Sequence, residues 1–324
     1  DDSKWQSVTV PHDWAIYGPF SSLNDKQEVA ISQDGQKEAM EHAGRTGGLP
    51  FVGVGWYRTE FDVPQFQAGK RATILFDGAM SHANVYINGQ KVGYWPYGYN
   101  SFHFDITKYL KPGEKNTLAV RLENLPESSR WYPGAGLYRN VHLIITEDAY
   151  IPVWGTYITT PSVNEKFAKV NVRTKVVLPE GADPAKYSVE TSVWNPNKQK
   201  LTAVRTSLAQ MKYNNNQAEQ EFVIQAPSLW SPEMPALYSA ETRLYEGDKL
   251  KDIYTTPFGI RSIEIIPDKG FFLNGKRTVF KGVCNHHDLG PLGAAVNDAA
   301  IRRQIRILKD MGCNAIRTSH NILN

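Results

Sequence analysis

The sequence predicts a mostly β protein that ends in the first part of an α/β barrel. Residues 1–147 alternate apolar and polar side chains in many short runs between turns, and residues 148–258 repeat this pattern. In residues 259–324 a strand, an amphipathic helix and a second strand follow one another instead. We therefore expect a jelly-roll sandwich, an immunoglobulin-like β-sandwich, and the first βαβ unit of an incomplete (β/α)8 barrel.

The first segment has the pattern of half-buried antiparallel strands. An Asn88-Gly89 pair follows one alternating run, and such a pair is the strongest short-range signal for a hairpin. Many short strands with frequent turns and almost no helical period favour a jelly roll or a similar sandwich. The strands are predicted at Trp56–Val63, Arg71–Phe76, Ala83–Ile87, Phe102–Asp105, Asn116–Glu123 and Asn140–Thr146.

The second segment holds further alternating runs, separated by polar turns at Asn195–Asn197 and Asn214–Asn216. About 110 residues with about seven short strands suit an immunoglobulin-like sandwich. The Cys-Trp-Cys signature is missing, so this prediction depends on the strand pattern alone. The runs are Val170–Val177, Tyr187–Trp194, Ala218–Ile224 and Ala236–Tyr245.

The third segment carries the pattern of a strand-helix-strand unit. A small hairpin at Phe271–Lys276 leads into a strand at Thr278–Val283, and a second short strand ends near His320. Between them, apolar residues at spacings of four and three predict one amphipathic helix. The stripe consists of Ile301, Ile305 and Leu308, and Asn297 and Gly312 suit the N-cap and the C-cap.

Composition argues against several classes of function. A net charge of +3 with scattered Lys and Arg gives no footprint for nucleic acid. No apolar run reaches the roughly 18 residues of a membrane span. The chain opens on Asp1 without a signal peptide, which neither shows nor excludes a removed targeting segment. Cys284 and Cys313 are expected at opposite ends of neighbouring parallel strands, so we predict two free thiols.

Polar side chains gather where both predicted strands of the third segment end. Ligands bind at the carboxyl ends of parallel strands, so these side chains should face one pocket. Each histidine has a simpler alternative role as a hydrogen-bond partner within a loop. Neither metal-ligand spacing nor a helical His pair is present, which argues against zinc. The residues are His286, His287 and Asp288 after the first strand, and Arg317, Ser319 and His320 at the second.

Aromatic residues form a second group in two Gly/Pro-rich loops of the first segment, Tyr94–Tyr99 and Arg130–Gly136. Trp and Tyr combine an apolar face with a polar group, which suits stacking on the C–H faces of a sugar. The same residues would also suit the ends of the sandwich or contacts between domains. The sequence leaves both roles open.

Short motifs spread along the whole chain carry a family resemblance. Through these motifs the chain resembles the N-terminal portion of glycoside hydrolase family 2 and, within that family, the β-galactosidases. The family's layout is a jelly-roll sugar-binding domain, an immunoglobulin-like domain and a (β/α)8 catalytic barrel, the same order as predicted above. The motifs are Val10–Trp14 (VPHDW), Gly55–Arg58, Val85–Gly89 (VYING), Tyr132–Asn140 (YPGAGLYRN), Phe258–Arg261, and the closing KGVCNHHD and NAIRTSHN.

The resemblance implies retaining hydrolysis of a terminal β-galactoside. That reaction needs two carboxyl groups about 5–5.5 Å apart, and in the family both are glutamates on later barrel strands. Residues 259–324 hold only the beginning of a domain that takes about 250 residues. We therefore expect a chain truncated early in the barrel, without either catalytic carboxylate and inactive by itself. Its third segment should pack on the immunoglobulin-like segment, associate with another chain, or be loosely ordered.

Several residues match supporting positions of the family. By the resemblance, His286 and His320 would hydrogen-bond sugar hydroxyls. Arg317 would pair with the nucleophile and keep it ionised. Ser129-Arg130 stands where some relatives have an acidic residue before the tryptophan. The candidate substrate-binding residues are His286, His320, Asn285, Asp288 and Trp131.

The expected partner is a β-galactoside oligosaccharide or glycoconjugate, with no nucleic acid and no membrane span. No metal ligand or other cofactor is assigned to these residues, and a divalent or monovalent cation elsewhere in the full-length enzyme is left open. The alternatives are a β-glucuronidase or β-mannosidase of the same family, and a non-catalytic carbohydrate-binding or scaffold protein. A homo-oligomer is left open, and a periplasmic or secreted location rests on analogy alone.

Overall fold

The computed structural model describes residues 2–43, 53–65, 69–210 and 217–321. The chain forms two compact units. The first consists of residues 1–145 and 281–324, and the second of residues 146–280. The predicted turn at 214–216 lies outside the described residues.

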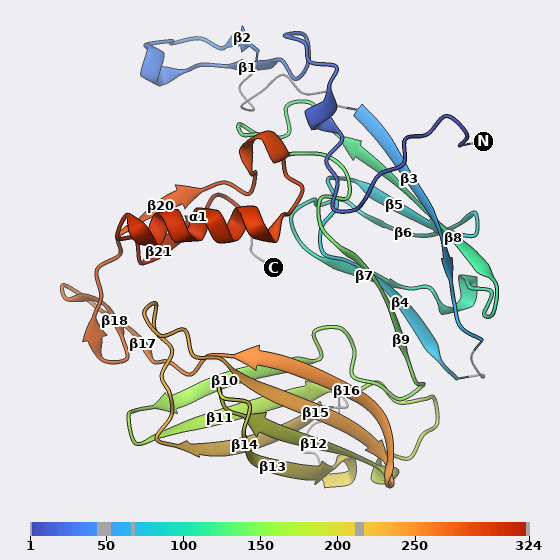
Figure 1. Ribbon diagram of the computed structural model, residues 1–324, viewed down its shortest axis with the longest axis vertical. Helices are drawn as coiled ribbons and strands as arrows, with labels where there is room; N and C mark the ends of the chain where they lie inside the picture. The colour runs from blue at the N-terminus through green and yellow to red at the C-terminus, as the bar shows by residue number, and fades with distance from the viewer. Residues whose placement is uncertain (1, 44–52, 66–68, 211–216, 322–324) are drawn as a thin grey trace. The chain divides into compact units, whose positions relative to one another are not determined.

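The first unit is built on a sandwich of two β-sheets (Figure 1). The four-stranded sheet has the order β3-β8-β5-β6, formed by Gly53–Asp62, Lys115–Asn124, Ala83–Ile87 and Gln90–Trp95. The three-stranded sheet has the order β7-β4-β9, formed by Phe102–Asp105, Arg71–Phe76 and Val141–Thr146. A separate antiparallel pair joins β1 (Gln27–Val29) to β2 (Met40–His42), and 3-10 helices lie at Ala15–Tyr17, Ser32–Asp34 and Thr107–Tyr109.

The predicted strands of this sandwich are confirmed, three of them with identical bounds (β4, β5 and β7). Strand β6 was not predicted, and Tyr94 and Trp95, which were expected in a loop, form its end. The local sequence explains the difference. The β5–β6 register shifts between Val85 and Tyr86, which breaks the alternation. Gly93 breaks it again, because a Cβ there would lie 2.3 Å from the Phe104 ring. The site is therefore filled by a side chain of the opposite sheet.

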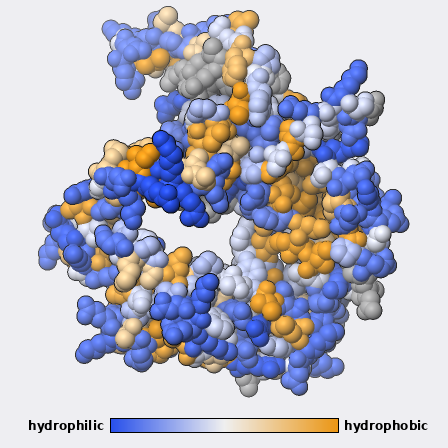
Figure 2. Space-filling model, viewed as in Figure 1, coloured by the Kyte–Doolittle hydropathy of each residue, from blue (hydrophilic) through white to orange (hydrophobic). Residues whose placement is uncertain are grey.

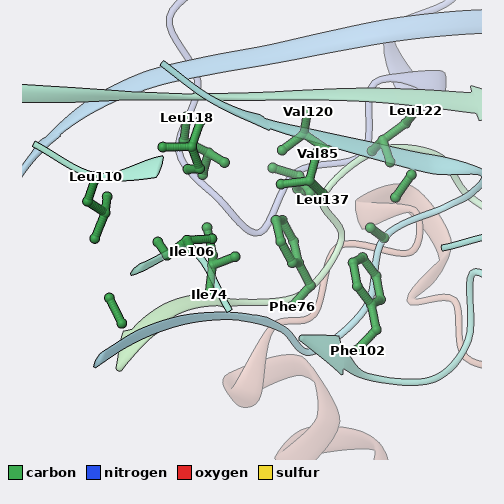
Figure 3. Packing of buried hydrophobic residues seen from close by; sticks show 14 of the residues in the cluster. Ile74, Phe76, Val85, Phe102, Ile106, Leu110, Leu118, Val120, Leu122 and Leu137 are labelled. Carbon is green, nitrogen blue, oxygen red and sulfur yellow. The ribbon is translucent and has the colours of Figure 1, made fainter. Parts of the chain in front are cut away.

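The core of the sandwich consists of apolar side chains from both sheets (Figure 3). Val85 and Val120 come from one sheet and meet Phe76 from the other, all fully buried or nearly so. The rings of Phe76 and Phe102 stack with centroids 4.9 Å apart. Burial of one such side chain stabilises the fold by about 1.5–3 kcal/mol, so this interface holds the two sheets together.

The second unit has the seven-stranded sandwich that the spacing predicted. One sheet has the order β10-β11-β14, formed by Thr156–Val163, Phe167–Lys175 and Gln217–Gln225. The other has the order β13-β12-β15-β16, formed by Lys200–Ser207, Tyr187–Trp194, Tyr238–Glu246 and Lys249–Phe258. The strands missing from the prediction are β10, β13 and β16, and none of them alternates regularly between buried and exposed side chains along its whole length.

The rest of this unit is a small three-stranded sheet and two short 3-10 helices. Strands β17 (Ile263–Ile266), β18 (Gly270–Leu273) and β19 (Lys276–Arg277) form the sheet, which contains the predicted hairpin. The 3-10 helices are Pro184–Lys186 and Leu208–Gln210.

The βαβ unit consists of β20 (Gly282–Asn285), α1 (Asp298–Asp310) and β21 (Ala315–Thr318), with a 3-10 helix at Gly290–Leu292. The strands are parallel, as predicted. Asn297 caps the helix, with its side-chain oxygen accepting from the Ala300 N–H at 3.0 Å. The predicted start of the first strand is wrong by four residues. Pairing begins only at Gly282, where the backbone comes so close to Ala315 that a Cβ would lie 2.1 Å from its carbonyl oxygen.

Residues 281–321 pack with the first sandwich in one compact unit. The third segment expected at 259–324 is divided, because residues 259–280 group with the second sandwich and residues 281–324 with the first. Backbone and aromatic groups of the first sandwich bind the loop that follows β20. The Val296 N–H, for example, donates to the Tyr138 carbonyl at 2.9 Å. Helix α1 has no buried residue, and Ile305 and Ile307 are 43% and 42% exposed. Figure 2 shows hydrophobic residues interspersed with hydrophilic ones on the visible face of the protein. Within the described ranges, no helix is long and apolar enough to cross a bilayer.

Candidate functional site

The two parallel strands bring His286 and His320 together. Strands β20 and β21 pair in register from Gly282 opposite Ala315 to Asn285 opposite Thr318, so they end at the same edge. His286 follows one strand directly and His320 follows the other by two residues. Their ring centroids lie 5.3 Å apart in an edge-on arrangement.

Trp131 of the first sandwich completes this group. Its indole ring lies 5.0 Å from the His320 ring and 5.6 Å from the His286 ring, between centroids. The indole N–H donates to the Tyr99 hydroxyl at 3.0 Å, which fixes the orientation of the ring. Burial raises the pKa of Tyr99 to about 12, so this hydroxyl is neutral at physiological pH. We call His286, His320 and Trp131 the histidine–tryptophan cluster.

His287 contacts Pro133, Tyr99 and Tyr138 and has a different role. Its Nε2 lies 3.0 Å from the Pro133 carbonyl oxygen, which can only accept, so Nε2 carries the hydrogen. Tyr99 meets its ring edge-on at 5.1 Å. Burial lowers the pKa of His287, which keeps the imidazole neutral. His287 therefore attaches its loop to the first sandwich, the simpler of the two roles considered for these histidines.

Arg317 lies on the exposed side of β21, beside Cys284 of β20. Its guanidinium donates to the Cys284 sulfur at 3.5 Å and to the Ser319 hydroxyl at 3.4 Å. The hydrogen bond from Arg317 lowers the pKa of the Cys284 thiol. Among the described residues no carboxylate forms an ion pair with Arg317, so its charge is available to an anionic group at this strand edge. Both cysteines are free, as predicted.

Asn285 and Asp288 flank the cluster without joining it. The Asn285 amide donates to the side chain of Gln304 on α1 at 3.4 Å. Asp288 is half-buried beside Tyr132. Burial and the Asp13 charge chiefly raise the pKa of Tyr132, and the charge of Asp288 adds to this rise. Asn285 thus connects the strand that leads to His286 with α1, whereas Asp288 acts on Tyr132 through its charge.

Three residues that contribute to the site are not among the candidate substrate-binding residues predicted from the sequence. Tyr99 holds the Trp131 indole, and Asn321 accepts a hydrogen bond from the Tyr97 hydroxyl at 3.1 Å. Asp13 is buried beneath the loops that carry the cluster. Tyr99 stands in the predicted aromatic loop, and Asp13 stands in the VPHDW segment. Their partners, however, are far away in the sequence.

A cleft of about 820 Å³ opens elsewhere in the first unit, at the side of the sandwich. His12, Trp14 and Trp56 help to line it, and no residue of the histidine–tryptophan cluster does. Figure 2 shows hydrophobic residues gathered over the first sandwich. The cleft is therefore separate from the candidate site, which is defined by side-chain chemistry rather than by cavity volume.

The cluster offers imidazole groups that donate and accept hydrogen bonds, next to an indole ring. Imidazole nitrogens suit hydroxyl groups, and an indole face suits the C–H face of a sugar. The Arg317 guanidinium, which forms an ion pair with no carboxylate among the described residues, lies on β21, the strand that leads to His320. Within the part of the chain that the structure describes, no three His, Cys, Asp or Glu side chains gather closely enough to hold a metal ion, so we assign no metal site.

Three family models match the chain in succession. Residues 47–147 match the glycosyl hydrolases family 2 sugar binding domain, residues 150–261 match glycosyl hydrolases family 2, and residues 264–321 match the family 2 TIM barrel domain. Together they include both sandwiches and the βαβ unit.

Individual relatives are similar over nearly the whole chain. Beta-galactosidase BoGH2A of Bacteroides ovatus is 42% identical over 99% of this chain, and a putative beta-glucuronidase of Formosa agariphila is 38% identical over 99%. The crystal structure of a glycosyl hydrolase family 2 member from Bacteroides cellulosilyticus has a TM-score of 0.86, 35% identity and 100% coverage of this chain. The chain spans 36%, 28% and 40% of these three proteins, about a third of their length.

Proposed function

Since the chain belongs to glycosyl hydrolase family 2, we propose that it is part of a retaining β-glycosidase that removes terminal β-galactosides. The observation that carries this proposal is the convergence of His286, His320 and Trp131 at the end of β21, the strand that also carries Arg317. Histidines, an indole ring and a guanidinium are the groups needed to hold a sugar ring and to stabilise a nearby carboxylate. The match of residues 47–147 to a sugar binding domain supports a carbohydrate ligand.

In the proposed reaction these residues position the sugar and tune the charge of the site. His286 and His320 hydrogen-bond ring hydroxyls, and such contacts accelerate the reaction where they strengthen in the transition state. Trp131 stacks on the apolar face of the sugar. Arg317 pairs with the carboxylate nucleophile and favours its ionised form, as an opposite charge nearby does. Asn285 and Asp288 flank this group at the end of β20.

The two catalytic carboxyl groups are proposed to lie outside these 324 residues, on barrel strands that follow β21. Retention requires them about 5–5.5 Å apart on either side of the glycosidic bond. We accordingly propose domains at 1–147, 148–258 and 259–324, a division that the ranges of the three family models support. The chain by itself is proposed to be inactive.

The preference for galactosides is supported by the similarity to a protein named beta-galactosidase at 42% identity. The putative beta-glucuronidase at 38% identity supports the alternative of a glucuronide, whose carboxylate would need a cationic partner. β-Mannosides are the further alternative within the family. A non-catalytic carbohydrate-binding protein is the alternative outside it.

The full-length protein should be assayed on 4-nitrophenyl β-galactoside, β-glucuronide and β-mannoside, with proton NMR of the first sugar product. We expect turnover of the galactoside with release of the β-anomer, and a KM raised about tenfold or more in His320→Ala. Release of the α-anomer would overturn the retaining mechanism, and preference for another glycoside would overturn the substrate. Sugar binding without turnover would favour the non-catalytic alternative. Turnover by the purified 324-residue chain would refute the proposed location of the carboxylates.

A further inference from the structure

We propose that Asp13 is a positioning residue for this site, because its buried carboxylate fixes the Trp131 loop to the His286 loop. The inference rests on the proposed function, since it concerns how the histidine–tryptophan cluster is assembled. Asp13 belongs to the N-terminal segment of the first sandwich, far from both loops in the sequence. Nothing in its own strand or helix pattern predicts this role.

Asp13 is only 1% exposed, and both of its oxygens are occupied. Oδ1 accepts hydrogen bonds from the backbone N–H groups of Ala15 at 3.0 Å and Ala135 at 3.1 Å. Oδ2 accepts from the Tyr132 hydroxyl at 2.6 Å and from the Ala294 N–H at 2.8 Å. These four hydrogen bonds compensate for the burial of the carboxylate, since a buried charge is tolerated only when it is hydrogen-bonded.

The four donors come from three separate stretches of chain. Ala15 belongs to the segment of Asp13 itself. Tyr132 directly follows Trp131 and Ala135 follows three residues later, so one loop supplies two donors. Ala294 lies in the loop that begins with His286 after β20. The carboxylate therefore connects the loop that carries the indole with the loop that carries one of the histidines.

Two glycines make this close approach feasible. Gly293 has φ +64°, and a Cβ there would lie 2.4 Å from Asp13 Oδ2. Gly134 has φ +73°, and a Cβ there would lie 2.2 Å from the Ala294 Cβ and 3.2 Å from the same oxygen. Any larger residue at either position would push the loops apart. Gly290, in the same loop as Gly293, has a similar φ of +61°, but a Cβ there would meet no atom within 4 Å.

The consequence for the site is geometric. The contact of the Trp131 ring with His286 depends on the distance between the two loops. Asp13 fixes that distance, because both loops donate hydrogen bonds to its carboxylate. A displacement of about 1 Å in a binding group can cost up to 100-fold in rate. Asp13 does not touch the sugar in this proposal and acts through Trp131 and His286.

The test compares Asp13→Asn with the wild-type full-length protein. An asparagine has the same shape, but its NH2 group replaces one carboxylate oxygen. That group cannot accept the hydrogen bonds that the two donors at this oxygen supply. We expect KM for 4-nitrophenyl β-galactoside to rise about tenfold while kcat changes less than about threefold, with free galactose binding weakened equally. A purely structural role would lower the melting temperature and the active fraction, and would leave the KM of the remaining folded enzyme unchanged.

A matched glycine pair keeps the proposal testable if Asp13→Asn folds poorly. Gly293→Ala and Gly290→Ala both place an alanine at a positive φ, but only the first places a methyl group against the Asp13 carboxylate. We expect Gly293→Ala to raise KM and Gly290→Ala to leave it within about twofold of wild type. Equal KM values for these two variants would overturn the inference, as would a wild-type KM in folded Asp13→Asn.

The two levels of the proposal can fail separately. If the wild-type protein neither binds nor hydrolyses a β-glycoside, or if His320→Ala has no effect, the proposed function fails. If wild type is active and His320→Ala is impaired, but Asp13→Asn and Gly293→Ala behave as wild type, only the role of Asp13 fails.

Discussion

Replacing Tyr132 by Phe removes one hydroxyl from the Asp13 network and leaves the ring in place. The deleted bond is short, at 2.6 Å, and its acceptor is a carboxylate that is 1% exposed. Hydrogen bonds to charged groups stabilise proteins by about 1.5–3 kcal/mol. We expect the local free energy of opening around Asp13 to fall by this amount, because Oδ2 retains a single donor, the Ala294 N–H.

Amide hydrogen exchange measures this change directly. The N–H groups of Ala15, Ala135 and Ala294 all donate to Asp13. If local opening limits their exchange, a loss of about 1.5–3 kcal/mol accelerates it about 10- to 150-fold. Mass spectrometry of peptides that contain these amides would report the effect in Tyr132→Phe relative to wild type.

Tyr187→Phe is the matched control. The Tyr187 hydroxyl also donates to a carboxylate, that of Glu246, but at 3.3 Å and with the glutamate side chain 41% exposed. Exposed polar pairs contribute about 0–1 kcal/mol, so exchange near Tyr187 should change less than about fivefold. Unchanged exchange at Ala135 and Ala294 in Tyr132→Phe, or equal effects of the two substitutions, would refute the reasoning from burial.

Three further predictions follow from the same structure. Cys284 should react with iodoacetamide faster than Cys313 at pH 7, because Arg317 lowers its thiol pKa, and Arg317→Ala should remove most of that difference. Asn297→Ala should destabilise α1 by about 1 kcal/mol, measured as faster amide exchange in its first turn, whereas an unchanged rate would exclude the cap as a stabilising contact. Burial raises the pKa of Tyr99 to about 12, so its contribution to stability is complete below about pH 10 and is lost as the pH rises towards 12. Other buried tyrosines such as Tyr132 also have a raised pKa, so both proteins should lose stability at high pH. Urea denaturation between pH 8 and 11 should show a steeper loss in wild type than in Tyr99→Phe, and parallel curves would contradict the prediction.

Much of the fold could be predicted because strands and caps are encoded locally. Strand β4, Arg71–Phe76, alternates without interruption between half-buried and buried side chains, and its predicted bounds match the structure. The N-cap at Asn297 depends on a bond that spans three residues. Where a distant side chain replaces the local pattern, as Phe104 does at Gly93, the prediction missed the strand.

The approach of His286 to His320 follows from topology, since neighbouring parallel strands end at the same edge of a sheet. The sequence by itself thus determined the order of the two sandwiches and the βαβ unit, and which side chains stand at its strand ends. Only the tertiary structure decided that Trp131 lies against both histidines and that Asp13 joins their loops. Alternation and capping depend on neighbours in the sequence, whereas the Asp13–Ala294 contact joins residues 281 positions apart. No local pattern encodes such a contact, because it exists only once both loops have folded around the same buried charge.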